Sequence, residues 1–138
     1  MKCDVYLTFD GNCEEAMLHY QDVFDGEIDI MMRYSEGPPE YNSPGIENKI
    51  MHTTMRFGTN CELKASDRMD ITIEKGNGYH VSVLADDEDQ GQSFFSGLAE
   101  GGHVTMPFDT VFWGGKFGSV IDRFGVQWMV STAHGENA

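Results

Sequence analysis

Residues 56–64 read RFGTNCELK, and residues 123–131 read RFGVQWMVS. Both stretches begin with Arg-Phe-Gly and continue with alternating side chains, a pattern typical of a strand that follows a tight turn. A match of three residues is weak evidence by itself. The element order around the two stretches decides whether one structural unit occurs twice in this chain.

The first half of the chain predicts the order strand, helix, strand, strand, strand. Residues 3–9 (CDVYLTF) alternate between apolar and polar side chains, which indicates a half-buried strand. Residues 12–24 change to a helical period, with Asn12 as the expected N-cap and Gly26 as the end of the helix. Three further strands are expected at residues 27–34, 49–57 and 60–66, and a Pro- and Gly-rich loop at residues 35–48.

The second half repeats this order. A shift of 76 residues places Val5 on Val81, and a shift of 67 residues places Arg56 on Arg123. The two shifts differ because the loop at residues 35–48 lengthens the first half. We therefore expect an α+β fold, a single domain over residues 1–138 that contains two β-α-β-β-β modules. Module one covers about residues 1–70 and module two about residues 77–133.

Composition and charge restrict the class of partner. A chain of 138 residues suits one compact body, and its formal net charge of −14 argues against a nucleic-acid partner. A neutral or cationic small molecule is easier to accommodate. The cysteines Cys3, Cys13 and Cys61 lack CxxC spacing, which favours reduced thiols in a cytoplasmic protein. No apolar run is long enough for a signal peptide or a membrane span, so we expect no membrane partner.

Three stretches resemble one known family. They are YLTFDGNCEEAMLHYQDVF (residues 6–24), MHTTMRF (51–57) and TVFWGGKFGSVIDRFGVQWMV (110–130). Together they resemble the PhnB-like branch of the vicinal oxygen chelate superfamily, which contains glyoxalase I, bleomycin-resistance proteins and extradiol dioxygenases. The resemblance implies a glyoxalase-like fold with curled mixed sheets around a cavity, and a homodimer. Members often carry a 3-demethylubiquinone 3-methyltransferase label, but the sequence lacks a glycine-rich turn for an adenosyl cofactor.

The two faces of the sheets differ in polarity. The apolar face, which we expect beneath the helices, carries Val5, Leu7, Leu63, Val81, Val83 and Val130. The opposite face carries Asp4, Tyr6, Thr8, His52, Thr54, Glu62, Lys64, His80, Ser82, Ser119, Gln127 and Met129. Burying such groups without partners costs about 1–3 kcal/mol each, so water or a ligand should contact them.

From this polar face we predict a ligand pocket. Trp113 joins it because the adjacent glycine pair Gly114-Gly115 allows a bend toward a cavity mouth, whereas Trp128 falls on the core side. The predicted pocket residues are Tyr6, Thr8, His52, Thr54, Glu62, Lys64, His80, Ser82, Trp113 and Met129.

The resemblance also implies positions for metal ligands. In metal-dependent superfamily members, each module supplies one ligand from its first strand and one carboxylate from its last. The corresponding residues here are Asp4 and His80, followed by Glu62 and Met129. Because a thioether is a poor ligand for these metals, the set is incomplete.

Three functions follow from these positions. The favoured one is a small-molecule-binding protein without metal or cofactor. The alternative is a metal-dependent lyase, isomerase or dioxygenase that uses Asp4, Glu62 and His80. In the third, the pocket is vestigial and the dimer surface carries the function.

Overall fold

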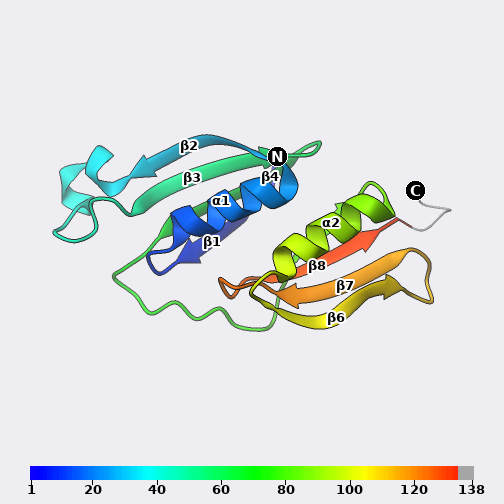
Figure 1. Ribbon diagram of the computed structural model, residues 1–138. Coiled ribbons are helices and arrows are strands. Elements are labelled where there is room, and N and C mark those ends of the chain that lie inside the picture. Colours follow the sequence, from blue (N-terminus) through cyan, green and yellow to red (C-terminus); the bar gives the residue numbers. More distant parts are fainter. Residues whose placement is uncertain (134–138) are drawn as a thin grey trace. The chain divides into compact units, whose positions relative to one another are not determined.

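The chain folds into two compact units in the computed structural model, which describes residues 1–133. The first unit is Met1–Glu74, and the second consists of the described residues from Lys75 on. Each unit has the order β-α-β-β-β, and its helix lies on one face of its sheet (Figure 1). The predicted repeat and fold class are confirmed.

The elements of the two units correspond one to one. The first unit contains β1 (Val5–Phe9), α1 (Cys13–Phe24), β2 (Glu27–Arg33), the short 3-10 helices η1 (Tyr34–Glu36) and η2 (Pro39–Tyr41), β3 (Ile50–Phe57) and β4 (Cys61–Asp67). The second unit contains β5 (Val81–Ala85), α2 (Glu88–Ala99), β6 (His103–Thr110), β7 (Lys116–Ile121) and β8 (Gln127–Thr132).

Both units contain a four-stranded mixed sheet. The strand order is β1-β4-β3-β2 in the first unit and β5-β8-β7-β6 in the second. The first and last strands of each unit run parallel, with Val5 opposite Leu63 and Val81 opposite Trp128. All other neighbouring strands run antiparallel. The helix of each unit therefore crosses from one edge strand of its sheet to the other, from β1 to β2 and from β5 to β6.

The two Arg-Phe-Gly stretches lie at the same hairpin but not at equivalent positions. Arg56 is still in β3, opposite Glu62, whereas β7 ends at Ile121, opposite Gln127, so that Arg123 lies in the turn. The counterpart of Glu62 is therefore Gln127, whereas the sequence shift of 67 residues had suggested Met129. Equivalent residues of the two hairpins are 65 positions apart, so the shift of 67 was wrong by two residues. Two is an even number, so the assignment of side chains to faces is unaffected.

Each helix buries an apolar stripe against its own sheet. α1 packs on β3 and β4, and α2 packs on all four strands of the second unit. The predicted apolar face is confirmed, because Leu7, Leu63, Val83 and Val130 are buried and Trp128 is fully buried. The helices contribute Ala16, Met17, Tyr20, Phe24, Phe95 and Leu98 to these cores.

Close packing in the second unit depends on two glycines around Phe108. A Cβ atom at Gly91 would lie 2.8 Å from Cζ of Phe108, and one at Gly118 would lie 2.8 Å from its Cα. The ring of Phe108 stacks on Phe95 with centroids 5.6 Å apart. The glycines thus allow α2 and β6 to approach β7, and Pro107 is tolerated because β6 is an edge strand with a register shift there.

A buried carboxylate organises the first unit. Asp67, at the end of β4, is 1% exposed. Its Oδ1 accepts hydrogen bonds from the backbone N–H groups of Gly11 (2.9 Å) and Cys13 (3.0 Å), and its Oδ2 accepts one from Ile50 (2.9 Å). The expected cap Asn12 makes no side-chain capping bond. A carboxylate distant in the sequence therefore satisfies the first turn of α1.

The end of α1 also differs from the expectation. The left-handed residue that ends the helix is Asp25 (φ 52°), and its N–H donates to the carbonyl of Gln21. Gly26 follows and is needed for space, because a Cβ atom there would lie 2.8 Å from Sδ of Met55.

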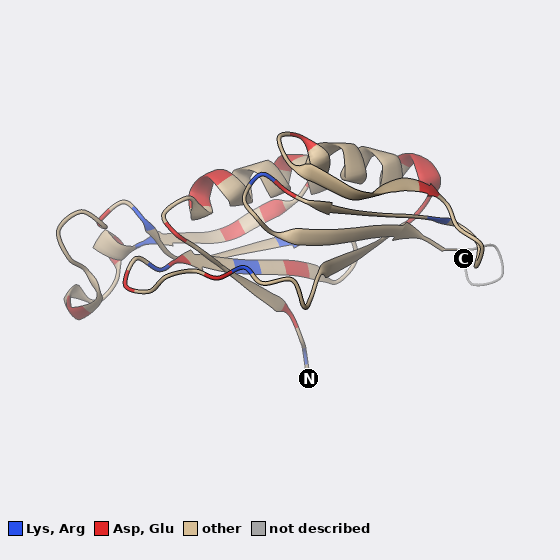
Figure 2. Ribbon diagram, turned by 90° about the horizontal axis from the view of Figure 1, so that it is seen from below, with Lys and Arg blue, Asp and Glu red and all other residues tan. Residues whose placement is uncertain are grey.

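The outer surfaces of both units are acidic. Neither helix contains a Lys or Arg, and Figure 2 shows acidic residues on both. The basic residues lie in strands and loops. Within residues 1–133, no helix is long and apolar enough to cross a membrane.

We predict that Asp67→Ala lowers the free energy of unfolding by about 3–5 kcal/mol, because three backbone donors lose a charged acceptor. Urea unfolding followed by circular dichroism measures the change. The control is Asp10→Ala, which removes an exposed carboxylate nearby and should cost less than about 0.5 kcal/mol. Equal costs for the two variants would contradict the central role of Asp67.

Candidate functional site

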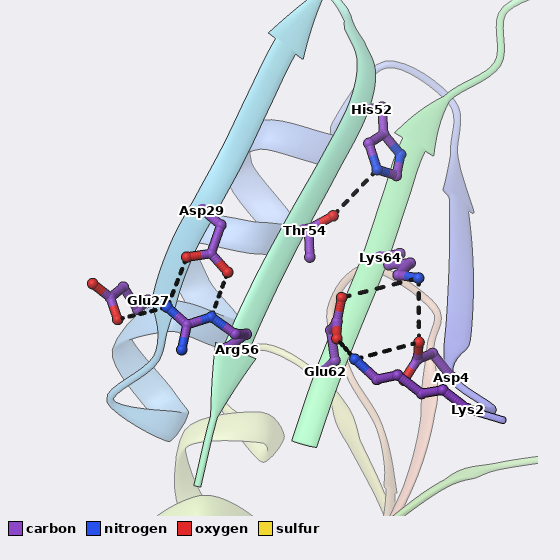
Figure 3. A network of polar contacts seen from close by, with 9 residues as sticks. All are labelled: Lys2, Asp4, Glu27, Asp29, His52, Thr54, Arg56, Glu62 and Lys64. Atoms are coloured by element: carbon purple, nitrogen blue, oxygen red, sulfur yellow. Dashed lines mark hydrogen bonds and ion pairs between the residues drawn. The ribbon is translucent and has the colours of Figure 1, made fainter. Parts of the chain in front are cut away.

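The open face of the first sheet, which points away from α1, carries most of the predicted site residues. Tyr6 lies opposite Lys64 in the β1–β4 pair, and Lys64 lies opposite Thr54 in the β4–β3 pair. Figure 3 views this face, with side chains from β3 and β4 in front of the ribbon. Side chains alternate between faces along a strand, so Glu62 lies on the same face as Lys64, and His52 on the same face as Thr54. We call this surface the polar face.

Four charged groups form an ion-pair cluster at one end of the polar face. Nζ of Lys64 lies 3.2 Å from Oδ2 of Asp4 and 4.0 Å from Oε1 of Glu62. Nζ of Lys2 contacts Oε2 of Glu62 and lies 3.8 Å from Oδ2 of Asp4 (Figure 3). The side chains of Asp4 and Glu62 are only 13% and 11% exposed. The two ammonium groups therefore neutralise two largely covered carboxylates, as such carboxylates require.

His52 is held from both sides. Its Nδ1 lies 3.0 Å from the hydroxyl of Tyr6, and its Nε2 lies 3.2 Å from Oγ1 of Thr54. The rings of Tyr6 and His52 also stack, with centroids 5.7 Å apart. Because hydroxyl groups can donate or accept, either neutral tautomer of His52 can satisfy both bonds. A ligand on this face would meet an oriented imidazole and two hydroxyl groups.

Arg56 was not expected in the site, although it faces the same way as Glu62 in the β3–β4 pair. Its Nε and Nη2 donate to the carboxylate of Asp29 at 2.6 and 2.9 Å, and Nη2 also reaches Glu27 at 3.2 Å (Figure 3). These bonds raise the pKa of Arg56 and hold the pKa of Asp29 below its ordinary value. Arg56 thus joins β3 to β2 through Nε and Nη2.

The open face of the second sheet is more apolar. Met129 on β8 lies opposite Ser82 on one side and Ser119 on the other. Phe117 lies two residues before Ser119 on β7 and therefore on the same face. The ring of Trp113 packs edge-on against Phe117, with centroids 6.0 Å apart, and is 51% exposed. Phe117 escaped the sequence analysis, although its alternation with Ser119 placed it on this face.

The predicted site residues thus fall into two groups. The first unit brings together Asp4, Tyr6, His52, Thr54, Glu62 and Lys64, with Thr8 one step further along β1. The second unit places Ser82 beside Met129, and His80 directly before β5. Among residues 1–133, no three His, Cys, Asp or Glu side chains form a group that could hold a metal ion.

Comparisons with known proteins agree with this geometry. Residues 1–131 match the family described as 3-demethylubiquinone-9 3-methyltransferase. The protein PA1353 from Pseudomonas aeruginosa is 33% identical, with 95% of this chain and 98% of that chain covered and a TM-score of 0.83. A PhnB protein from Bacillus cereus is 30% identical, with 96% and 100% covered and a TM-score of 0.78.

A more distant structure shows the fold alone. A glyoxylase/bleomycin resistance protein/dioxygenase domain from Frankia sp. EAN1pec is 11% identical and has a TM-score of 0.70. It covers 97% of this chain, and 92% of that domain is covered. The paired β-α-β-β-β units therefore have the glyoxalase-like architecture.

Proposed function

The chain belongs to the 3-demethylubiquinone-9 3-methyltransferase family, and on that premise we propose that it is a small-molecule-binding protein of the vicinal oxygen chelate type that uses no metal ion. One observation carries the proposal. On the polar face, the carboxylates are neutralised by lysines and His52 is held by hydroxyl groups, while α1 covers the opposite face of the sheet. Such a surface can bind polar groups with side chains that are already oriented.

The family's description names a methyltransferase, but the strand–helix turns of this chain do not support that activity. The turn from β1 into α1 contains one glycine, Gly11, and the turn from β5 into α2 consists of Asp86 and Asp87. A dinucleotide or adenosyl cofactor is usually held by a glycine-rich turn in a parallel, doubly wound sheet. Both sheets here are mixed, so we do not propose methyl transfer.

The open faces of the two sheets differ in chemistry. The polar face of the first unit presents Lys64, the hydroxyl of Tyr6 and the imidazole of His52. The second sheet presents apolar surface, including Phe117, Met129 and the half-exposed Trp113. For the polar face we propose a neutral or cationic ligand that carries hydrogen-bonding groups.

Two further properties complete the proposal. Cys3, Cys13 and Cys61 are free thiols in the described residues, which supports a cytoplasmic location. The edge strand β6 is mostly exposed and presents Val104 to solvent, and such edges are commonly covered by a second copy. We therefore propose a homodimer.

The first test is ligand binding on the polar face. We predict that hits from a library of neutral and cationic small molecules shift the amide resonances of residues 52–54 and 62–64. His52→Ala should weaken binding about tenfold, because the hydroxyl groups of Tyr6 and Thr54 lose the partner that orients them. His103→Ala is the matched control, since His103 is exposed on β6. A library in which no hit perturbs the polar face would refute the proposal.

The second test concerns metal. We predict that protein purified without chelator holds no stoichiometric zinc, manganese, nickel or iron by elemental analysis, because Lys2 and Lys64 already occupy the carboxylates of Asp4 and Glu62. Near-equimolar metal that is lost in His80→Ala or Glu62→Ala would instead establish the lyase, isomerase or dioxygenase alternative. Asp10→Ala serves as the control for nonspecific metal.

The third test is the oligomeric state. We predict a dimer by light scattering at micromolar concentration. Val104→Lys should shift the equilibrium toward monomer, because it places a charge on the exposed β6 edge. The control Leu18→Lys changes an exposed residue of α1 and should leave the mass unchanged. A monomeric wild type would end the dimer proposal without affecting the ligand proposal.

A further inference from the structure

A pocket lies in the first unit beside the segment between β2 and β3. After β2 the chain leaves the sheet, forms η1 and η2, and returns at β3; Figure 1 shows this segment in cyan beyond the end of β2. Between the segment and residues 68–70, which follow β4, is a pocket of about 660 Å³. This volume is in the range of sites for small organic molecules. None of its lining residues belongs to the predicted ligand pocket.

The walls of this pocket, which we call the loop pocket, are tied to the rest of the unit. The hydroxyl of Tyr34 donates to the carbonyl of Asp67 at 2.6 Å. The N–H of Tyr34 donates to the carbonyl of Lys49 at 3.0 Å, which joins the two ends of the segment. Arg33 binds both carboxylate oxygens of Glu14 on α1, at 3.1 and 2.8 Å. The pocket is therefore largely formed before any ligand arrives.

The charges that line the loop pocket favour a cation. Both nitrogens of the Arg68 fork donate to Asp70, at 3.1 and 2.8 Å, so the guanidinium is already neutralised. This pairing lowers the pKa of Asp70, which therefore stays ionised at neutral pH. Glu40 also lines the pocket and has no hydrogen bond or ion pair with any residue of 1–133. The lining thus keeps one uncompensated carboxylate.

The remaining lining combines aromatic and aliphatic side chains with the polar residues Asn42 and Ser43. The rings of Tyr34 and Tyr41 contribute, together with Ile46 and Met69, and Tyr41 is 62% exposed. Aromatic faces attract ammonium groups, by about 0.5–1 kcal/mol at exposed sites. A carboxylate beside two tyrosine rings and aliphatic side chains matches an ammonium group attached to an apolar body.

We propose that the loop pocket binds an organic ammonium cation with an aromatic or aliphatic body. Glu40 provides the ionic partner, Tyr41 covers the cation, and Ile46 and Met69 contact the apolar part. The loop pocket and the polar face share no residue, and neither proposal requires the other.

The test uses benzyltrimethylammonium as the probe, with amide resonances followed by two-dimensional NMR. Saturable shifts confined to residues 40–46 and 68–70 are expected. Benzenesulfonate, an anion of similar size, should produce none. Shifts at residues 52–54 and 62–64 instead would place the cation on the polar face and overturn this proposal. Absence of saturable binding at millimolar probe would also overturn it.

Variants assign the contacts. Glu40→Gln and Tyr41→Ala should each weaken probe binding about fivefold. Their controls are Glu15→Gln on α1 and Tyr79→Ala in the second unit, both exposed and outside the pocket. Asp70→Asn should release Arg68, weaken benzyltrimethylammonium binding and permit benzenesulfonate binding. Unchanged affinity in both Glu40→Gln and Tyr41→Ala would overturn the assignment.

Discussion

The carboxylate of Asp67 joins three parts of the first unit that are far apart in the sequence. It accepts backbone hydrogen bonds from the turn before α1, from the first residue of α1 and from the first residue of β3. A buried carboxylate is stable only with such partners, and each partner would be unsatisfied without it. The interaction therefore fixes where the helix begins relative to β3 and β4. The polar face depends on it, because those strands carry His52, Glu62 and Lys64.

The second unit reaches the same topology with a different anchor. Asp122, which is 3% exposed, lies in the β7–β8 turn. Its Oδ1 accepts from the N–H groups of Phe124 and Val126, and its Oδ2 accepts from Nε1 of Trp128 at 2.8 Å. α2 has its own cap, since the side chain of Asp87 accepts from the N–H of Gln90. The repeat therefore preserves element order and strand register more than individual interactions.

This difference explains what the sequence could predict. Alternation and helical period are local properties, so the strands, the helices and the apolar faces followed from them, including the burial of Trp128. The capping of α1 by Asp67 depends on a contact between residues 54 positions apart in the sequence. Asn12 was a reasonable local candidate for the cap, but its side chain makes no capping bond. The position of Arg-Phe-Gly within each hairpin was hidden in the same way, because the triplet begins inside β3 but only after β7 has ended. Equating the two Arg-Phe-Gly stretches misplaced the counterpart of Glu62 by two residues.

The candidate site was predictable as a face but not as a set of contacts. Period two placed Tyr6, His52, Thr54, Glu62 and Lys64 together. No pattern could show that His52 is bonded at both nitrogens. The lysine pairing of Asp4 and Glu62 depends equally on side-chain reach, and Lys2 lies before the first strand. The loop pocket was hidden for a related reason, since its lining comes from an irregular segment with no period to read.

Net charge also proves a poor guide to local chemistry. The value of −14 describes the whole chain, but salt limits the influence of an exposed charge to about 8 Å under physiological conditions. The acidic helix α1 packs on the face of the first sheet that lies opposite the polar face. On the polar face, Lys2 and Lys64 balance Asp4 and Glu62. The formal charges of these four groups sum to zero, so they give the polar face little preference for a cation. The unpaired carboxylate of Glu40 gives the loop pocket a stronger preference, so selection for charge should differ between the two surfaces of one unit.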